Sequence, residues 1–475
     1  MLAVGFSVLT LSVCPPSSPP ALQLVQSIPV GDFNIGLAPC ALATWEAQAE
    51  LARNSSYSLD ITAMYMDLLG LEDRKHFTPS QMKAFGADRG TTLFNELKAA
   101  AKRGVRIRLL LGTLQDPLNS TEVKTLLSYH NVEARMWEPK TWYGGGIMHA
   151  KIWVSDHNKR GYIGSANTDW KSLAQVKELG ARLDADGGAS YAVYELSKLF
   201  DVFWEWADPS FPIQKGVSAY SRTFQATLTV APWEYLVPEA DRYHSPFDTP
   251  KLASWFDISH PFQLPKGASG FISSSPYGSL TGVRVPDIDA LVHTLQEAKT
   301  SACLSVMDFL PSSDFEGGHG GAPVFWPTLT NAILAAVYSK PIHLKLLVSH
   351  WAHTGKEQVD AMYHLTGGLA ACKNAWQKCA GSLEIKQYFV PGWNATLPSK
   401  GVKRNANETW PSYTRVNHAK YIVTDNRVNV GTSNWQWGYF HNTAGASLNV
   451  NDTGLIEAAQ AAFDADWESE YAVAM

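Results

Sequence analysis

The sequence has few charged residues, few cysteines and no basic surplus. Asp, Glu, Lys and Arg make up only 17% of the 475 residues, while hydrophobic residues make up 45%, which excludes a disordered chain, a coiled coil or a collagen-like repeat. With 39 Lys and Arg against 44 Asp and Glu, the net charge is −5, so the chain is no basic nucleic-acid binder at neutral pH. Full protonation of the 14 histidines would bring the charge to +9, enough to attract a polyanion in an acidic compartment.

The five cysteines are too few for a disulfide scaffold. Cys372 and Cys379 are close enough to bridge across a short loop. The other pairings stay open, and buried free thiols are the alternative. A chain of this length can bury a sizeable core without such bridges.

The beginning of the chain points to the secretory pathway. Residues 1–14 are apolar and resemble the core of a secretory signal. Prolines follow at once, so this stretch is too short to span a membrane, and no later segment is long and apolar enough. Five glycosylation sequons favour the same route, to the lysosome or the cell exterior; they lie at Asn54, Asn119, Asn394, Asn407 and Asn451.

The chain repeats one order of strands and helices. In the first half we expect a strand ending at residues 27–29, a helix 41–52, a strand 58–66, a helix 91–103, a strand 105–111, a helix 121–129, a strand 132–137 and a strand carrying His149. In the second half we expect a strand at 274–276, a helix 287–298, a strand 303–310, a helix 326–338, a strand 342–349, a helix 357–366, a strand 383–390 and a strand carrying His418.

This alternation predicts an α/β fold with a largely parallel sheet, made twice. We expect an apolar, Pro-rich N-terminus at 1–20, a first domain at 21–206, a connecting segment at 207–266 and a second domain at 267–475. Two similar domains with one key histidine each imply a pseudo-twofold axis. A single site at their junction is the natural place for both histidines to meet.

Each half carries the same motif. The first copy reads His-Ala-Lys at 149–151 and Gly-Ser-Ala-Asn at 164–167; the second reads His-Ala-Lys at 418–420 and Gly-Thr-Ser-Asn at 431–434. In a strand, residues i and i+2 share a face, so each histidine is expected to point the same way as its lysine. Two such sets would surround one anion with two imidazoles, two ammoniums, two carboxamides and two hydroxyls, which suits a tetrahedral phosphate.

The residue types suggest how the chemistry is divided. One histidine attacks phosphorus and the other protonates the leaving oxygen, while Lys151, Lys420, Asn167 and Asn434 stabilise the phosphate oxygens. Ser165 and Thr432 are further candidates for substrate contact. Trp435, in an aromatic cluster after the second motif, could stack a base, although core packing explains it equally well.

The repeated motif resembles the signature of the phospholipase D superfamily. Its flanks, at 164–180, 417–424 and 443–448, look like the lysosomal 5′-to-3′ exonuclease branch of spleen-exonuclease type. The resemblance implies two phospholipase D-type α/β/α sandwich domains related by pseudo-twofold symmetry, with one shared active site and no metal or cofactor.

The resemblance also implies a reaction and partners. The expected reaction is hydrolysis of single-stranded DNA or RNA from a free 5′-hydroxyl end through a phosphohistidine, with release of nucleoside 3′-monophosphates. The alternative is a phospholipase D or transphosphatidylase acting on glycerophospholipids, since the same site attacks either diester. A homodimer is a further expected association.

In that family a glutamate fourteen residues after the motif glycine buttresses a catalytic histidine. Glu178 fits this spacing in the first half, whereas Gly445 occupies the matching place in the second, so the halves are chemically unequal. We expect His149 to be the nucleophile, supported by Glu178, and His418 to be the general acid. The reverse assignment stays open, because spacing does not fix roles.

Other polar residues near the motifs are interpreted as structural. Asp156 and Asp425 are expected to hold the hairpins rather than to take part in the reaction. His350 and His353 have a spacing that could suggest a metal site, but no further ligand cluster accompanies them, and a loop at the end of a strand is the preferred interpretation.

Overall fold

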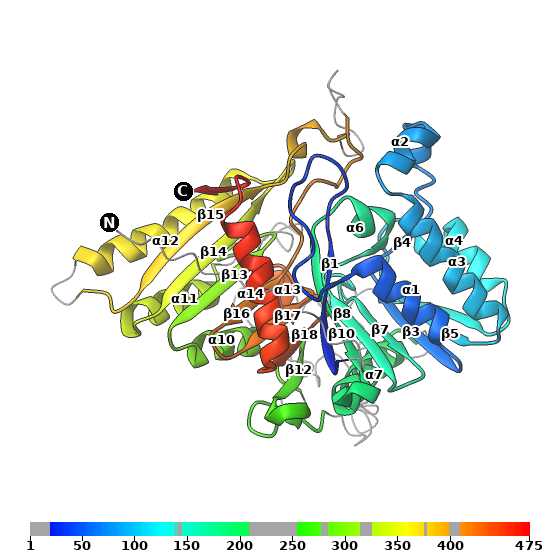
Figure 1. Ribbon diagram of the computed structural model, residues 1–475, viewed down its shortest axis with the longest axis horizontal. Coiled ribbons are helices and arrows are strands. Elements are labelled where there is room, and N and C mark those ends of the chain that lie inside the picture. The colour runs from blue at the N-terminus through cyan, green and yellow to red at the C-terminus, as the bar shows by residue number, and fades with distance from the viewer. Residues whose placement is uncertain are drawn as a thin grey trace, which may run out of the picture.

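The computed structural model of the chain (Figure 1) shows two large sheets with helices packed against them. The residues it describes are 20–137, 139, 145–208, 254–276, 284–313, 325–374, 378–398 and 409–475. The signal-like residues 1–14, most of the connecting segment 207–266 and the sequon at Asn407 lie outside them.

The first sheet has eight strands in the order β2-β1-β10-β8-β7-β3-β5-β6. Their bounds are β1 Leu22–Ser27, β2 Leu42–Ala43, β3 Ser58–Ala63, β5 Arg106–Leu111, β6 Val132–Met136, β7 Ile152–Ser155, β8 Arg160–Gly164 and β10 Glu178–Asp184. A separate two-stranded sheet joins β4 (Met66–Asp67) to β9 (Thr168–Asp169).

The second sheet has nine strands in the order β11-β12-β18-β17-β16-β13-β14-β15-β19. Its middle seven repeat the order of the first sheet from β1 to β6, which confirms the predicted internal repeat. Their bounds are β11 Phe262–Gln263, β12 Ser269–Ser275, β13 Ser301–Val306, β14 His343–His350, β15 Ser382–Phe389, β16 Tyr421–Thr424, β17 Val428–Gly431, β18 Gly445–Val450 and β19 Ala472–Ala474.

The prediction of largely parallel sheets is wrong. In the first sheet β3, β5 and β6 run parallel, but β1, β10, β8, β7 and β3 pair antiparallel in succession. The second sheet follows the same pattern. Helices do link the parallel strands β3, β5 and β6, as the alternation predicted, but β7 and β8 form a short hairpin, which can join only antiparallel neighbours.

Helices cover both faces of the sheets. Those on the outer faces are amphipathic: α3, for example, buries Leu93, Leu97 and Ala100 at spacings of three and four residues. The outer helices are α1 Thr44–Asn54, α3 Asp88–Lys102, α4 Thr121–Leu127, α10 Asp287–Glu297, α11 Thr328–Ser339 and α12 Lys356–Asn374; shorter ones are α2 Pro79–Ala84, α6 Trp170–Ala174 and α13 Trp437–His441.

Helix α12 is longer than predicted, because it continues through Gly367 and Gly368 where the sequence pattern suggested an end. Leu365, Leu369 and Cys372 stay buried along this extension, and a Cβ on Gly368 would lie 2.6 Å from the Leu334 side chain of α11. Close helix packing therefore outweighs the low helix propensity of glycine here.

The two halves share one core because the last helix of each half packs on both sheets. The last helix of the first half, α7 (Ser190–Trp206), packs on β12, the first long strand of the second half; the last helix of the second half, α14 (Thr453–Trp467), packs on β1. Residues of both helices belong to a single apolar cluster that also contains residues of both sheets. In Figure 1, α14 (red) lies over the middle of the molecule, between β16 and β1.

One expected cysteine pairing is present in the structure. Cys372 and Cys379 are bonded, with an S–S distance of 2.05 Å, as their spacing allowed, while Cys303 is a buried free thiol. No helix in the described part of the chain is long and apolar enough to cross a lipid bilayer.

Candidate active site

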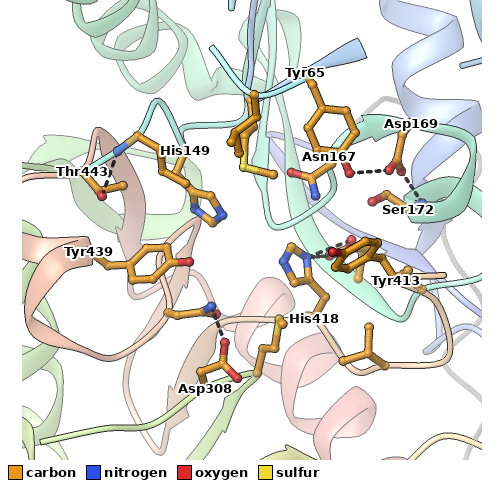
Figure 2. Close-up of a pocket in the computed structure, with 18 of the residues that line it drawn as sticks. Tyr65, His149, Asn167, Asp169, Ser172, Asp308, Tyr413, His418, Tyr439 and Thr443 are labelled. Carbon is orange, nitrogen blue, oxygen red and sulfur yellow. Dashed lines mark hydrogen bonds and ion pairs between the residues drawn. The ribbon is translucent and has the colours of Figure 1, made fainter. Parts of the chain in front are cut away.

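A pocket of about 650 Å³ opens at the junction of the two halves. Both motif histidines line it, together with polar and aromatic side chains from each half (Figure 2). The first half contributes Tyr65, His149, Asn167, Asp169, Lys171 and Glu178, and the second contributes Asp308, Trp351, Tyr413, His418, Asn434 and Tyr439.

The backbones of the two halves pair directly beside the histidines. The His149 N–H donates to the Ala444 carbonyl at 2.9 Å, and the His418 N–H donates to the Lys177 carbonyl at 2.8 Å. Each histidine was expected within a strand, but β7 and β16 begin only three residues later, at Ile152 and Tyr421. The expectation was wrong because the backbone at each histidine bonds to the opposite half instead of its own sheet.

The two imidazoles face each other across the pocket. Their ring centroids are 6.4 Å apart and the ring planes are 74° apart. His149 is 3% exposed and His418 8% exposed, so both rings are largely removed from water. Tyr439 packs edge-on against His149, with a centroid distance of 5.0 Å.

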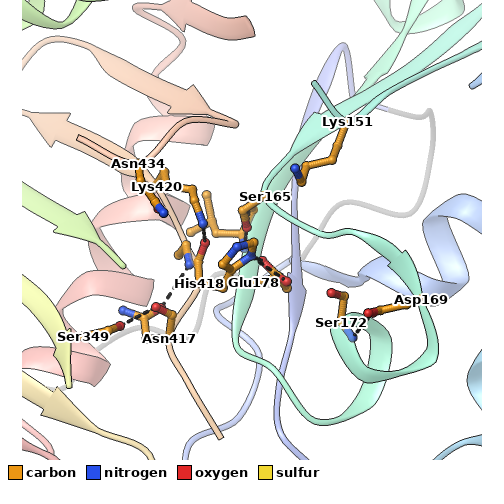
Figure 3. A network of polar contacts seen from close by, with 12 residues as sticks. Lys151, Ser165, Asp169, Ser172, Glu178, Ser349, Asn417, His418, Lys420 and Asn434 are labelled. Carbon is orange, nitrogen blue, oxygen red and sulfur yellow. Dashed lines mark hydrogen bonds and ion pairs between the residues drawn. The ribbon is translucent and has the colours of Figure 1, made fainter. Parts of the chain in front are cut away.

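Glu178 supports His418, not His149, which corrects the predicted pairing. Nδ1 of His418 lies 3.0 Å and 2.9 Å from the two carboxylate oxygens of the fully buried Glu178 (Figure 3). The cause is the crossed backbone pairing, since Lys177 pairs with Asn417 and places the next residue, Glu178, beside the histidine of the other half.

The matching position in the second half has no room for a carboxylate. A Cβ on Gly445 would lie 2.3 Å from Ser433 Oγ and 2.7 Å from Ser275 Oγ. The hydrogen-bond partner that acts on the His149 ring is the backbone of Thr432, an uncharged group, rather than a carboxylate. The two imidazoles therefore sit in unlike surroundings, as the sequence predicted, although the histidine that receives the carboxylate is the other one.

These surroundings act differently on the two rings. Burial, followed by the charges of Lys151 and Lys420, lowers the pKa of His149 well below its usual value of 6.5. Burial also lowers the pKa of His418, but the Glu178 carboxylate opposes this. Burial lowers the pKa of Lys420 to about 7. Without substrate, His149 is thus disposed to be neutral, and His418 has a counter-charge for its proton.

Of the motif lysines and asparagines, only the asparagines line the pocket, whereas the lysines hydrogen-bond to the backbone of the two histidines. Lys151 and Lys420 are almost fully buried, and each Nζ donates to the carbonyl of the histidine two residues before it. Asn167 and Asn434 line the pocket. The amide nitrogen of Asn434 donates to Asp308 Oδ2 at 2.8 Å, which fixes the carboxamide against a second-half carboxylate.

The three predicted substrate-binding residues do not line the pocket. The Ser165 hydroxyl exchanges hydrogen bonds with the backbone of Leu179, and Thr432 Oγ1 accepts one from the Ala446 N–H at 3.0 Å. Trp435 is 2% exposed and lies in the core of the second half. The geometry therefore gives these side chains a part in joining the hairpins and filling the core, while Tyr439 from the same aromatic cluster reaches the pocket.

Sequence reasoning missed several lining residues. Asp308 and Tyr65 stand just beyond the carboxyl ends of the equivalent strands β13 and β3, where α/β sheets commonly place binding residues; this was the available signal. Tyr65 donates to Asp169 Oδ2 at 2.7 Å. Trp351 directly follows the carboxyl end of β14, so the same signal applied to it, and residues 351–353 also resemble the exonuclease branch. Tyr413 lies in a loop without such a signal.

The third motif residues, Asp156 and Asp425, hold backbone as predicted. Asp156 accepts hydrogen bonds from the N–H groups of Ser56, Tyr57 and Ser58 at the start of β3. Asp425 accepts from the N–H groups of residues 299–301 at the start of β13. Neither aspartate lines the pocket.

We therefore expect Asp156→Ala to lower the free energy of unfolding by about 1–3 kcal/mol, because three donors lose their acceptor, and to leave kcat of the folded enzyme within a few-fold. Chemical denaturation and initial rates measure the two effects. Asp360→Ala, which removes only an exposed ion pair with Lys356, serves as the control and should change stability by less than about 0.5 kcal/mol. A large loss of kcat with unchanged stability would contradict the structural role of Asp156.

The structure also describes His350 and most of the glycosylation sequons. His350 ends β14 and packs against the rings of Phe389 and Trp393, in agreement with a strand-end histidine. In the described ranges no group of three or more His, Cys, Asp or Glu side chains is arranged to hold a metal ion. Among the sequons, Asn54, Asn119 and Asn394 are exposed, while Asn451 accepts a hydrogen bond from the Ser269 N–H.

Comparisons with known proteins agree with this architecture. Residues 73–204 match the family described as "Cardiolipin synthase, PLD-like domain", and residues 237–392 match "PLD3/4, PLD-like domain". The chain is 31% identical over 463 residues to 5′-3′ exonuclease PLD3 of Xenopus laevis, which covers 95% of this chain and 80% of that protein. It is 29% identical over 451 residues to phospholipase D Z of Dictyostelium discoideum, covering 95% and 90%.

The fold also resembles a solved structure. The phosphatidylserine synthase of Haemophilus influenzae superposes with a TM-score of 0.50 at 10% identity, over 91% of this chain and 85% of that one. Its likeness shows the fold alone. The fold, the repeated His-x-Lys site and the extent of the sequence similarity together show that this chain belongs to the phospholipase D superfamily, alongside the PLD3 and PLD4 exonucleases.

Proposed function

We propose that this chain is a metal-independent phosphodiesterase that degrades single-stranded DNA or RNA from a free 5′-hydroxyl end. One observation carries the proposal: two buried imidazoles with unlike surroundings face each other across one pocket, 6.4 Å apart, with a carboxylate behind only one of them. Membership of the superfamily supports phosphodiesterase activity, and the similarity to PLD3 and PLD4 exonucleases supports a nucleic acid substrate.

The first step forms a covalent phosphohistidine. A ring nitrogen of neutral His149 attacks phosphorus, the N–P bond forms, and the bond from phosphorus to the 5′-oxygen of the next nucleotide breaks. His418, whose Nδ1 is held by Glu178, gives its Nε2 proton to that leaving oxygen. Lys151 and Lys420 stabilise the charge on the non-bridging oxygens, with Asn167 and Asn434 as neutral donors.

The second step returns the enzyme to its starting state. His418, now neutral, takes a proton from water, and the resulting hydroxide attacks phosphorus. The N–P bond breaks, which releases a nucleoside 3′-monophosphate and restores neutral His149 and protonated His418. The same two groups therefore serve both steps, and activity requires one to be neutral while the other is protonated.

A phospholipase D or transphosphatidylase activity is the second candidate. One wall of the pocket is apolar, formed by Val176, Met307, Trp351 and Val416, and the Dictyostelium relative bears the name phospholipase D Z. An apolar wall suits an acyl chain, but it suits the face of a nucleobase equally well. Substrate tests separate the two.

We further propose that the protein works in the secretory pathway, in the lysosome or outside the cell. The Cys372–Cys379 disulfide suits an oxidising compartment. The exposed sequon asparagines Asn54, Asn119 and Asn394 are accessible to glycosylation. An acidic compartment also suits the lowered pKa values of His149 and His418.

The direct test uses 3′-labelled single-stranded oligonucleotides in EDTA at acidic pH, one with a 5′-hydroxyl and one with a 5′-phosphate. We expect stepwise shortening of the 5′-hydroxyl strand from its 5′ end, release of 3′-monophosphates and at least tenfold slower loss of the 5′-phosphorylated strand. Full loss of activity in EDTA would contradict the proposal of a metal-independent mechanism. Failure to shorten either strand, with release of choline from phosphatidylcholine vesicles, would favour the phospholipase.

A further inference from the structure

A stack of one buried and two exposed aromatic rings lies along the pocket. The rings of Tyr413 and His353 are stacked, with centroids 5.0 Å apart and planes 9° apart, and Trp351 packs against His353 at 4.5 Å. Trp351 and Tyr413 line the pocket. The Tyr413 side is open to solvent, because this residue is 51% exposed and His353 is exposed as well. The pocket thus continues outward as an aromatic surface.

Tyr413 lies on the side of His418 (Figure 2). Trp351 packs with Val176 and Val416, which stand two residues before Glu178 and His418. In an in-line displacement the leaving oxygen departs opposite to the nucleophile. If His418 protonates that oxygen, the polynucleotide attached to it emerges past His418, toward the aromatic stack.

The exposed tyrosine is held in place by its neighbours in the chain. The backbone of Tyr413 has φ +58°, which is uncommon for a residue other than glycine and persists only where the surroundings impose it. Two residues later, the fully buried Arg415 donates to the carbonyls of Gly31 at 2.8 Å and Pro391 at 2.6 Å. The ring is therefore presented to solvent in a fixed position, which lowers the entropic cost of binding a ligand.

From this geometry we propose that Trp351, His353 and Tyr413 form a stacking platform for the nucleobases that follow the scissile phosphate. The inference rests on the proposed exonuclease function. It gives a binding site to the part of the strand that departs after cleavage. Stacking on aromatic rings tolerates every base, because each base has a π-face, so the platform suits an enzyme that removes nucleotides in succession. It also requires unpaired bases, which are available in a single strand.

The test combines a protein variant with a substrate variant. Two 5′-hydroxyl oligonucleotides share the same terminal thymidine; one continues with thymidines, and the other has tetrahydrofuran abasic sites at its second and third positions. In the wild-type enzyme we expect the abasic sites to raise KM by roughly 5- to 100-fold and to leave kcat within about twofold. Tyr413→Leu should raise KM for the thymidine strand to a similar extent and leave the abasic strand unchanged.

Two further variants serve as controls. Tyr413→Phe keeps the ring and should restore the wild-type preference. Tyr57→Leu is the matched control, because Tyr57 is also exposed (62%), also lies beside a histidine, His157, with ring centroids 5.2 Å apart, and does not line the pocket. It should leave KM for both strands unchanged.

The outcomes separate the platform from the exonuclease function. If wild-type enzyme shortens both strands with equal KM, or if Tyr413→Leu raises KM equally for both, base stacking on this surface is wrong and the exonuclease function stands. If wild-type enzyme shortens no oligonucleotide, the exonuclease function is wrong and the platform falls with it.

Discussion

His149→Ala is expected to abolish turnover of every diester, with kcat/KM reduced by about 10⁴- to 10⁶-fold. The imidazole of His149 is the proposed nucleophile, and its ring centroid lies 6.4 Å from that of His418. The loss should persist with a p-nitrophenyl ester of a nucleoside 3′-phosphate, because a better leaving group does not replace a missing nucleophile.

His418→Ala separates the two roles. A p-nitrophenolate group leaves without protonation, so this variant should release about one equivalent of p-nitrophenol per enzyme and then stop, because no base remains to activate water. The phosphoryl group should be trapped on His149, where mass spectrometry after alkaline quenching locates it. A burst in His149→Ala, with the phosphoryl group on His418, would show the reverse assignment.

His350→Ala is a suitable control for both variants, since His350 is a half-buried histidine at the end of β14 that does not line the pocket. Its kcat/KM should stay within a few-fold of wild type. Thermal unfolding of all three variants shows whether any loss of activity comes from loss of the fold.

Glu178→Gln is expected to lower kcat/KM on oligonucleotides by about 10²- to 10⁴-fold. The glutamine keeps the size of the side chain but removes the charge that favours protonated His418. Because the carboxylate raises the pKa of His418 against the effect of burial, its removal lowers that pKa further. At a given pH a smaller fraction of His418 then carries the proton that the leaving oxygen needs.

The pH profile gives the sign of this effect. In the wild type, activity should fall at low pH as His149 becomes protonated, and at high pH as His418 loses its proton. Burial lowers the pKa of both rings, so the maximum should lie on the acid side of pH 6.5. Glu178→Gln should shift the alkaline limb of kcat/KM to lower pH, and the p-nitrophenyl ester should lose much less activity than the oligonucleotide.

Asp287→Asn is the matched control, because Asp287 is another buried carboxylate and does not line the pocket. It accepts a hydrogen bond from the Ser273 hydroxyl at 2.6 Å. It should leave the pH profile unchanged. An alkaline limb that stays in place in Glu178→Gln would show that His418 does not act as the general acid through this carboxylate.

The sequence predicted the local secondary structure for the most part, and it predicted the internal repeat. The order of the helices and strands, and the meeting of His149 with His418, followed from spacing and from the internal repeat. It also marked Glu178 and Gly445 as the unequal positions. The strand pattern failed at the histidines, where β7 and β16 begin late, because their backbone bonds are made across the junction.

The partner of Glu178 was beyond sequence reasoning for the same physical reason. Spacing after the motif glycine describes one half, whereas the contact with His418 spans 240 residues and depends on which edges of the two halves meet. Tyr413 is a similar case. Its position at the pocket follows from the anchoring of Arg415 against Gly31 and Pro391, which no local pattern reveals.

The packing of α7 and α14 on both sheets bears on why the two histidines can have different surroundings. A single unit of this kind would leave one face of its first strand uncovered, because α1 packs on one face of β1 and α14 of the other half packs on the opposite face. A protein with one copy would cover both faces as a symmetric dimer with its site on the twofold axis. In such a dimer both histidines have identical neighbours, since one gene encodes them. Two copies within one chain are free of that restriction, so a carboxylate at Glu178 can coexist with glycine at its counterpart, Gly445. The different roles of the two histidines, nucleophile and acid, therefore depend on both copies lying in one chain, where equivalent positions can carry different residues.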